Sequence, residues 1–289
     1  MSEKFRLAEL DLAGTSIPQM ESDDGLSYEF SEFLQRQAGD ASPAVTGVTM
    51  TSHKFNFETQ HIQTIIDLCI ATAGNENICQ GFPSSGADQI LTFRKGKSSG
   101  VRTPLATAEH IDQRVDASFL SWESFNAPAD GNATISCRLQ TLSALTNDKA
   151  AALSSVSVVD QAFKCGPIVF RITGDIADRE PCVLSATWEN NITYDDKNCS
   201  GSDFTNYSAI DDYESVLTID LDDMTQAIDA NASVALTSCV FYLKQVGETN
   251  AASKHIKFTV TAGDVLPSSN RQLKFRVRSF TIATDQAIA

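Results

Sequence analysis

Histidine is the residue type in this sequence that could take part in the widest range of chemistry, because an imidazole can bind a metal ion or transfer a proton near neutral pH. The four are His53, His61, His110 and His255. A metal site needs several converging ligands, and the sequence contains neither an HxH nor an HExxH spacing. His110 and His255 instead occupy matching positions of an internal repeat. We therefore expect these two to be structural, each with a hydrogen bond at a strand end, and predict no metal site.

Carboxylates are the next candidates, because calcium prefers oxygen-rich loops. Acidic residues cluster at positions 195–196, 211–212 and 220–223. None of these clusters has the EF-hand spacing, so we interpret them as solvated surface. The sequence singles out no carboxylate pair for glycoside hydrolysis and leaves that possibility open.

Motifs for covalent catalysis and for cofactor binding are absent from the sequence. It has no GxSxG elbow, no Walker A loop and no GxGxxG. We therefore predict no catalytic residue, no cofactor and no enzymatic activity. Trp122 and Trp188, with nearby Phe119, Phe125 and Tyr194, could line a sugar-binding platform, although packing between strands is the favoured interpretation.

Seven cysteines are present, an odd number with no CxxC pair, which argues against a zinc ribbon and favours reduced, buried thiols. No signal peptide and no run of membrane-span length is visible, so we expect a protein made in the cytoplasm without a membrane partner.

Length and charge set further bounds. The 289 residues suffice for two domains, and a hydrophobic content of 42% lets each bury a core. The net charge of −15 and the pI of about 4.6 argue against tight nucleic-acid binding, which requires basic patches. DNA could still pass nearby without adhering.

An internal repeat is the main organising feature of the sequence. Residues 106–117 around His110 align without a gap with residues 251–262 around His255. Further matches link 91–96 with 240–244, 135–142 with 275–282, and 55–58 with 219–222. In this alignment Arg138 corresponds to Arg278. Because the matches occur in one order, we predict a duplication.

The elements follow from periodicity and turn residues. We predict a helix over 59–73, a strand over 45–57, and a hairpin formed by 110–125 and 132–142. In the second half we predict strands at 168–173, 183–194, 215–221, 234–246, 254–262 and 271–283. A polar loop is expected over 195–212, and a short helix from 222 to 230.

The predicted fold is mainly β, with two tandem similar domains of β-sandwich or barrel type, each with one flanking α-helix, and an extended N-terminal arm. We place the arm at 1–44, the first domain at 45–146, a connector at 147–155 and the second domain at 156–289.

This pattern of a strand, a helix and further β-hairpins, repeated once in an acidic chain with long loops, resembles the tail tube proteins of long-tailed bacteriophages. The resemblance covers most of the chain and rests on pattern rather than on a diagnostic motif. It implies a virion tail protein, assembled in the host bacterial cytoplasm, whose inner sheets join into a β-lined channel. Some members carry two tube domains per chain and form trimeric rings with pseudo-sixfold symmetry.

The resemblance also implies partners: further copies of the chain, other tail proteins, and DNA that crosses the lumen without specific binding. The loops 75–88 and 96–104 and the arm become candidates for ring stacking. The basic residues Arg94, Lys95, Lys97 and Arg102, in and just before the second loop, could meet acidic residues of the next ring, or could simply form a solvated turn. Alternatives are another virion protein, such as a capsid decoration, tail terminator or adaptor, and a carbohydrate-binding β-sandwich.

Overall fold

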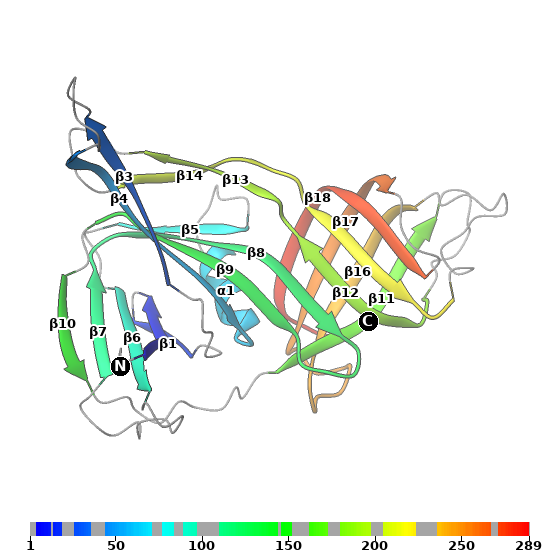
Figure 1. The fold of residues 1–289 in the computed structure, drawn as a ribbon. Coiled ribbons are helices and arrows are strands. Elements are labelled where there is room, and N and C mark those ends of the chain that lie inside the picture. The colour runs from blue at the N-terminus through cyan, green and yellow to red at the C-terminus, as the bar shows by residue number, and fades with distance from the viewer. Residues whose placement is uncertain are drawn as a thin grey trace.

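A computed structural model gives the structure of this protein. It describes the following residues: 4–12, 14–18, 26–35, 44–70, 77–83, 89–96, 110–143, 146–151, 162–172, 180–197, 205–223, 236–266 and 271–288. These residues form antiparallel strands and a single described helix, arranged in an elongated molecule (Figure 1). The prediction of a mainly β protein is confirmed.

A five-stranded sheet lies at one end of the molecule (Figure 1, left). Its strands, in spatial order, are β10 (Thr146–Ala151), β7 (His110–Val115), β6 (Gln89–Gly96), β1 (Lys4–Leu12) and β2 (Thr15–Pro18). β1 pairs with β6 and β10 with β7, so parts of the predicted arm and of the predicted connector lie within this sheet.

An eleven-stranded sheet extends through the rest of the molecule. Its path begins with β11 (Phe163–Ile172), β16 (Leu236–Gln245), β17 (His255–Leu266), β18 (Gln272–Gln286), β15 (Val216–Leu221) and β12 (Val183–Glu189). It continues with β8 (Ser118–Pro128), β9 (Thr134–Thr141), β4 (Ala44–Thr59) and β3 (Leu26–Gln35), while β5 (Cys79–Phe82) pairs with β8.

One pairing joins the two halves of the chain. Residues 124–128 of β8 pair with residues 185–189 of β12, and the sheet is continuous across this junction. Beyond it the sheet curls back on itself. Among the described strands, β11 pairs with β16 at one end of the path, yet it also lies next to β12 and β8. The second half therefore has a barrel-like form (Figure 1, right).

Helix α1 (Ile62–Ile70) lies within the range predicted for a helix. Ile62, Ile65, Ile66 and Cys69 recur at helical spacing and are all buried, which gives α1 one apolar face. The helix packs beside β5, β8 and β18. A bilayer-spanning helix needs about 20 residues, and no helix in the described part of the chain meets the requirements for crossing a membrane.

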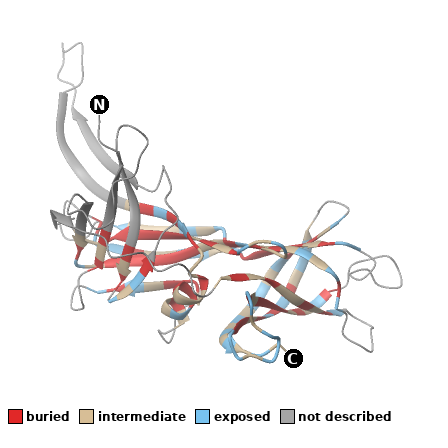
Figure 2. Cartoon of the chain, turned by 90° about the horizontal axis from the view of Figure 1, so that it is seen from below, coloured by how far each residue is buried: buried red, intermediate tan, exposed pale blue. Residues whose placement is uncertain are grey.

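One hydrophobic core runs through both halves. The cluster of buried side chains includes Leu10 and Leu91 from the five-stranded sheet, Leu139 from β9 and Phe258 from β17. Figure 2 shows buried residues in both parts of the molecule and on the strands between them. The two sheets of the first half therefore pack face to face, and their core continues into the barrel-like part.

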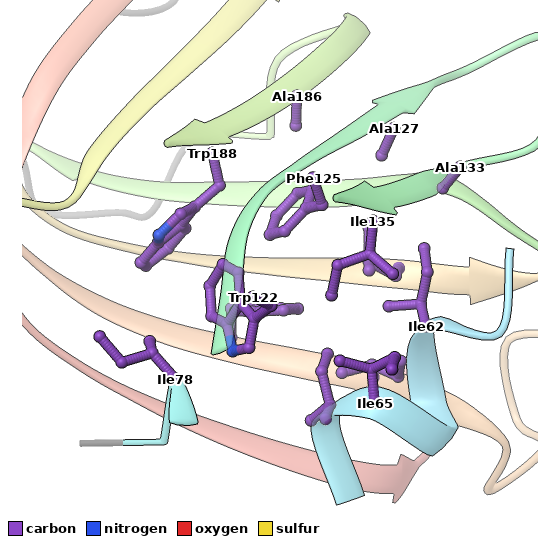
Figure 3. Packing of buried hydrophobic residues seen from close by; sticks show 14 of the residues in the cluster. Ile62, Ile65, Ile78, Trp122, Phe125, Ala127, Ala133, Ile135, Ala186 and Trp188 are labelled. Carbon is purple, nitrogen blue, oxygen red and sulfur yellow. The ribbon is translucent and has the colours of Figure 1, made fainter. Parts of the chain in front are cut away.

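Aromatic rings form the centre of this core. Phe125 of β8 lies 6.0 Å from Trp188 of β12 and 5.3 Å from Phe258 of β17, measured between ring centroids. Phe241 stacks on Phe258 at 4.4 Å with the ring planes 8° apart. Figure 3 shows Phe125, Trp122 and Trp188 converging, with Ile62 and Ile65 of α1 nearby. A first-half residue thus fills the core of the second half.

Three predicted segments differ from the structure. The predicted strand over 110–125 is two strands, because the chain leaves the five-stranded sheet after β7 and enters the long sheet at β8, so only β8 forms the predicted hairpin with β9. The predicted strand over 183–194 breaks at Asn191, whose φ of 44° is left-handed, a conformation that asparagine tolerates. The predicted polar loop instead contributes to a two-stranded sheet of β13 (Ile192–Lys197) and β14 (Tyr207–Tyr213).

The halves share some strand neighbours but differ in how these join. β6 pairs with β7 as β16 does with β17, and β4 pairs with β9 as β15 does with β18. However, β7 and β9 lie in separate sheets, whereas β17 and β18 are neighbours. Most of the second predicted helix, residues 224–230, lies outside the described residues. The duplication stays a prediction.

The shared aromatic core yields a test of stability. Replacing Phe258 by alanine should lower the free energy of unfolding by about 3–5 kcal/mol, because the ring is fully buried and the neighbouring rings would line a cavity. Urea denaturation of the purified variant measures this. The control is Leu184→Ala, at a side chain 45% exposed, which should change the value by about 0.5 kcal/mol or less. Equal effects of the two changes would contradict the packing described here.

Candidate functional site

The predicted stacking residues lie at the end of β6 and beyond it. Arg94 and Lys95 are in β6, where their backbones pair with Arg6 and Phe5 of β1. Their side chains, together with Lys97 and Arg102, lie outside the described part of the chain. The backbone therefore places two of the four basic residues on a strand rather than in a turn.

His255 is the first residue of β17 and is fully buried. Its Nδ1 accepts a hydrogen bond from the backbone N–H of Gln245 at 3.1 Å, and its Nε2 lies 2.9 Å from the carbonyl oxygen of Thr249. This pattern requires a proton on Nε2, so the ring links the ends of two strands as a neutral imidazole. His110 begins β7, and its side chain lies outside the described residues.

Among the described Arg, Lys, Asp and Glu residues, Arg138 is the one that is buried. On β9 the core residues Ile135, Cys137 and Leu139 alternate with Ser136 and Arg138, so Arg138 points to the opposite face of the sheet. That face is also covered, because Arg138 is only 4% exposed. Its partner in the repeat, Arg278, is exposed on β18. The two matched arginines thus have different surroundings.

The cover is the hairpin of β13 and β14. Arg138 Nη2 donates to Asp196 Oδ2 of β13 at 2.6 Å, and the guanidinium carbon lies 3.7 Å from the centre of the Tyr194 ring. Asp196 also accepts a hydrogen bond from Ser208 of β14 at 2.6 Å, and its Oδ2 lies 3.8 Å from Lys54 Nζ. We call this group, Arg138, Tyr194, Asp196 and Ser208, the hairpin clamp.

The hairpin clamp holds charges in place rather than exchanging protons. Tyr194 donates to Glu123 at 3.0 Å and lies 2.7 Å from the Ser121 hydroxyl. Burial, with a contribution from the Glu123 carboxylate, raises the pKa of Tyr194 well above its usual value. The phenol therefore stays protonated at neutral pH beside a permanent guanidinium charge. Such an arrangement suits fastening one element on another.

Asn190 fastens the base of the same hairpin. Its side-chain amide donates to the carbonyl of Trp122 at 3.0 Å, while its Oδ1 accepts from the Trp188 indole at 2.6 Å and from Ser215 at 2.7 Å. Because Asn190 is fully buried, these bonds satisfy polar groups of both tryptophans inside the core.

The aromatic platform considered from the sequence is absent from the surface. Trp122 is 1% exposed and Trp188 is fully buried, and Phe119 and Phe125 are buried as well. The fifth residue, Tyr194, is covered by Arg138. Because a sugar stacks on an exposed ring face, these residues cannot form the platform, and packing between strands is their role.

The acidic clusters are only partly solvated. Asp196 carries the buried ion pair, Asp195 pairs with Lys197, and Asp220 accepts a hydrogen bond from Ser185 at 2.5 Å. The expectation of solvated surface is therefore wrong for Asp196, whose side chain is 15% exposed. Within the described ranges, no group of three or more His, Cys, Asp and Glu side chains could hold a metal ion.

The thiols follow the sequence-based expectation at five positions. Cys69, Cys79, Cys137, Cys165 and Cys239 are free and buried, and Cys182 is free and exposed. Burial raises the pKa of Cys165 to about 12, and it also raises the pKa values of Cys69, Cys137 and Cys239 well above the usual value of a thiol. These thiols stay protonated, which removes their nucleophilic character.

An open cleft of about 680 Å³ lies beside β18. Arg276, Arg278 and Phe280 line it from β18, with Tyr213 from the end of β14 and Glu214 from the turn that follows. Arg276 Nε donates to Glu214 at 2.5 Å. Sequence reasoning singled out Arg278 only as a repeat partner and missed this cleft.

Sequence reasoning also missed the hairpin clamp. Ile192 and Tyr194 alternate with Thr193 and Asp195, which is a weak strand signal that the aspartates obscured. No local pattern could pair Arg138 with Asp196, because 58 residues separate them.

Breaking the hairpin clamp on one side should destabilise the fold. Arg138→Met removes the 2.6 Å partner of the largely buried Asp196 carboxylate and leaves it Lys54 at 3.8 Å. The free energy of unfolding should therefore fall by up to about 3–5 kcal/mol in urea denaturation. The double variant Arg138→Met with Asp196→Leu should recover much of this loss. The matched control is Lys197→Met, which breaks an exposed pair on the same hairpin and should cost about 1 kcal/mol or less. A loss for Arg138→Met no larger than the control would contradict the clamp.

Thiol accessibility gives an independent check of burial. Brief treatment of the native protein with iodoacetamide should modify Cys182 and spare the five buried cysteines, because the attacking group in this alkylation is an accessible thiolate. Peptide mass spectrometry measures each site, and the protein in denaturant, where all seven cysteines should react, is the control. Cys199 lies outside the described residues, so the comparison uses the other six. Rapid modification of Cys137 in the native protein would contradict the described core.

Comparisons with known proteins add no relative. No protein-family model matches the chain, and a search of curated proteins found no significant match. Any function must therefore be inferred from the fold and from the side chains described above.

Proposed function

We propose that this chain is a structural virion protein that assembles into stacked rings and forms the tail tube of a long-tailed bacteriophage. In this proposal the tube conducts DNA without binding it specifically, and the chain needs no cofactor. The proposal keeps the two halves as diverged copies, so three chains would form a ring with pseudo-sixfold symmetry.

The open end of the long sheet carries the proposal. β3 pairs with β4 along its ten residues, and no described strand lies on its other side. An unpaired edge of this length presents a row of backbone donors and acceptors, which invites a strand from another chain. β3 and the start of β4 also extend beyond the rest of the sheet (Figure 1), and an isolated two-stranded ribbon is marginally stable by itself.

The opposite end of the sheet is built differently. β11 contains Pro167, which has no backbone N–H to donate, and the Phe163 carbonyl of the same strand accepts a hydrogen bond from Ala133 N–H at 2.6 Å. This end is therefore less available for pairing than β3. Unequal ends favour a head-to-tail contact, and such a contact closes a ring when its rotation permits.

Charge also favours a conduit over a nucleic-acid-binding protein. The net charge of −15 would repel phosphates, so DNA in a lumen would slide rather than adhere. The shared strand neighbours of the two halves support the duplication, while their different connections imply extensive divergence.

Direct imaging tests the proposal. Purified protein at increasing concentration should form rings or tubes in negative-stain electron microscopy, and sedimentation velocity should show a species of three chains. Rings with sixfold-looking symmetry built from three chains are the expected result. Discrete assemblies without tubes would instead favour a capsid-decorating or adaptor role. Protein that stays monomeric at high concentration would overturn the proposal.

A further inference from the structure

Besides the basic residues of positions 94–102, a second group of cations lies near the C-terminal end of this acidic chain. Between Asp264 and Asp285 the sequence has no acidic residue but contains Arg271, Lys274, Arg276 and Arg278. The chain as a whole has 37 acidic residues against 22 basic ones. The segment therefore departs sharply from the overall charge.

The backbone of β18 arranges three of these cations in a row. Leu273 and Phe275 are buried, and the alternation of a strand places Lys274 and Arg276 on the opposite, outer face. The pairing register shifts between Val277 and Ser279, and Arg278 at this irregularity is exposed. Residues two apart on one face are spaced by about 6.6 Å. We call these three residues the cationic strip.

Most of the strip has no internal counter-charge. Arg276 pairs with Glu214 and lies 3.8 Å from Asp264, and its side chain remains 49% exposed. For Lys274 and Arg278, no acidic partner is present among the described residues. Arg278 is exposed and Lys274 partly so. Two cations are therefore available to another molecule.

The strip borders a recess of suitable size. Arg276 and Arg278 line the 680 Å³ cleft, together with Phe280 and Tyr213. A protein segment entering this cleft would meet guanidinium groups and apolar ring surface together. Arginine and aromatic side chains are enriched at protein interfaces for this combination of properties.

The charge of the molecule indicates what binds at the cationic strip and its cleft. If the proposed function holds, copies that each carry −15 must approach one another despite their net repulsion. A cationic surface of one copy that meets an acidic surface of the other offsets this repulsion. The cationic strip is a surface of this kind, and acidic surface is abundant.

We propose that the cationic strip and its cleft form an interface that receives an acidic surface of a second copy of this chain. This inference rests on the proposed function, because it assigns one contact of the assembly. The strip supplies electrostatic attraction, and the cleft supplies the apolar contact that fixes the register of the two copies.

Charge reversal tests the strip. The double variant Lys274→Glu with Arg278→Glu should require at least roughly tenfold more protein for half-maximal assembly in sedimentation velocity. The matched control reverses two exposed lysines elsewhere, Lys197→Glu with Lys254→Glu. It has the same net charge, and its assembly should stay closer to that of the unmodified protein. Circular dichroism melting verifies that both variants fold.

The outcomes separate the two proposals. If the unmodified protein assembles and the strip variant assembles equally well, this inference is overturned while the proposed function stands. If the unmodified protein does not assemble at all, both are overturned. A short DNA duplex is added in a separate fluorescence anisotropy measurement. Binding that the unmodified protein shows and the strip variant loses would assign the strip to nucleic acid and overturn a second copy as its occupant.

Discussion

The contact among Phe125, Trp188 and Phe258 is the constraint on which the remaining architecture depends. Phe125 comes from the first half of the chain, and the other two rings come from the second. Their packing fixes β8 against β12, which makes the long sheet continuous. The position of the hairpin clamp follows, since Asn190 links the hairpin to both tryptophans. The two halves of the chain therefore share one hydrophobic core and one continuous sheet in the described structure.

The sequence predicted elements where a local pattern determined them. The spacing of Ile62, Ile65 and Ile66 sufficed for α1, and alternation sufficed for β15 to β18. The prediction failed where residues distant in the sequence determine which strand another strand pairs with. The chain changes sheets between Val115 and Ser118, and nothing in the alternation of those residues distinguishes one sheet from another. The break at Asn191 depends on its buried neighbour Asn190, which only the assembled core explains.

The candidate sites show the same difference between what a local sequence pattern predicts and what distant residues determine. Repeat matching drew attention to His255, Arg138 and Arg278, yet it assigned equivalent roles to residues with different surroundings. His255 joins two strand ends, Arg138 is buried beneath a hairpin, and Arg278 borders an open cleft. A sequence match conserves position along the chain, but burial depends on which element covers the residue. Most of the hairpin that covers Arg138, from residue 195 onward, was predicted to be a loop.

The junction between β8 and β12 also has a consequence during synthesis on the ribosome. The paired segments are separated by about sixty residues, from 185 − 128 = 57 to 189 − 124 = 65. At roughly 5–20 residues per second, β8 emerges about 3–13 seconds before its partner. Throughout that interval the edge of β8 that later pairs with β12 has no partner, and the ring of Phe125 lacks its neighbours from the second half. Neighbouring nascent chains on one messenger could pair through this edge, so slow translation of the intervening segment would penalise the yield of correctly folded protein.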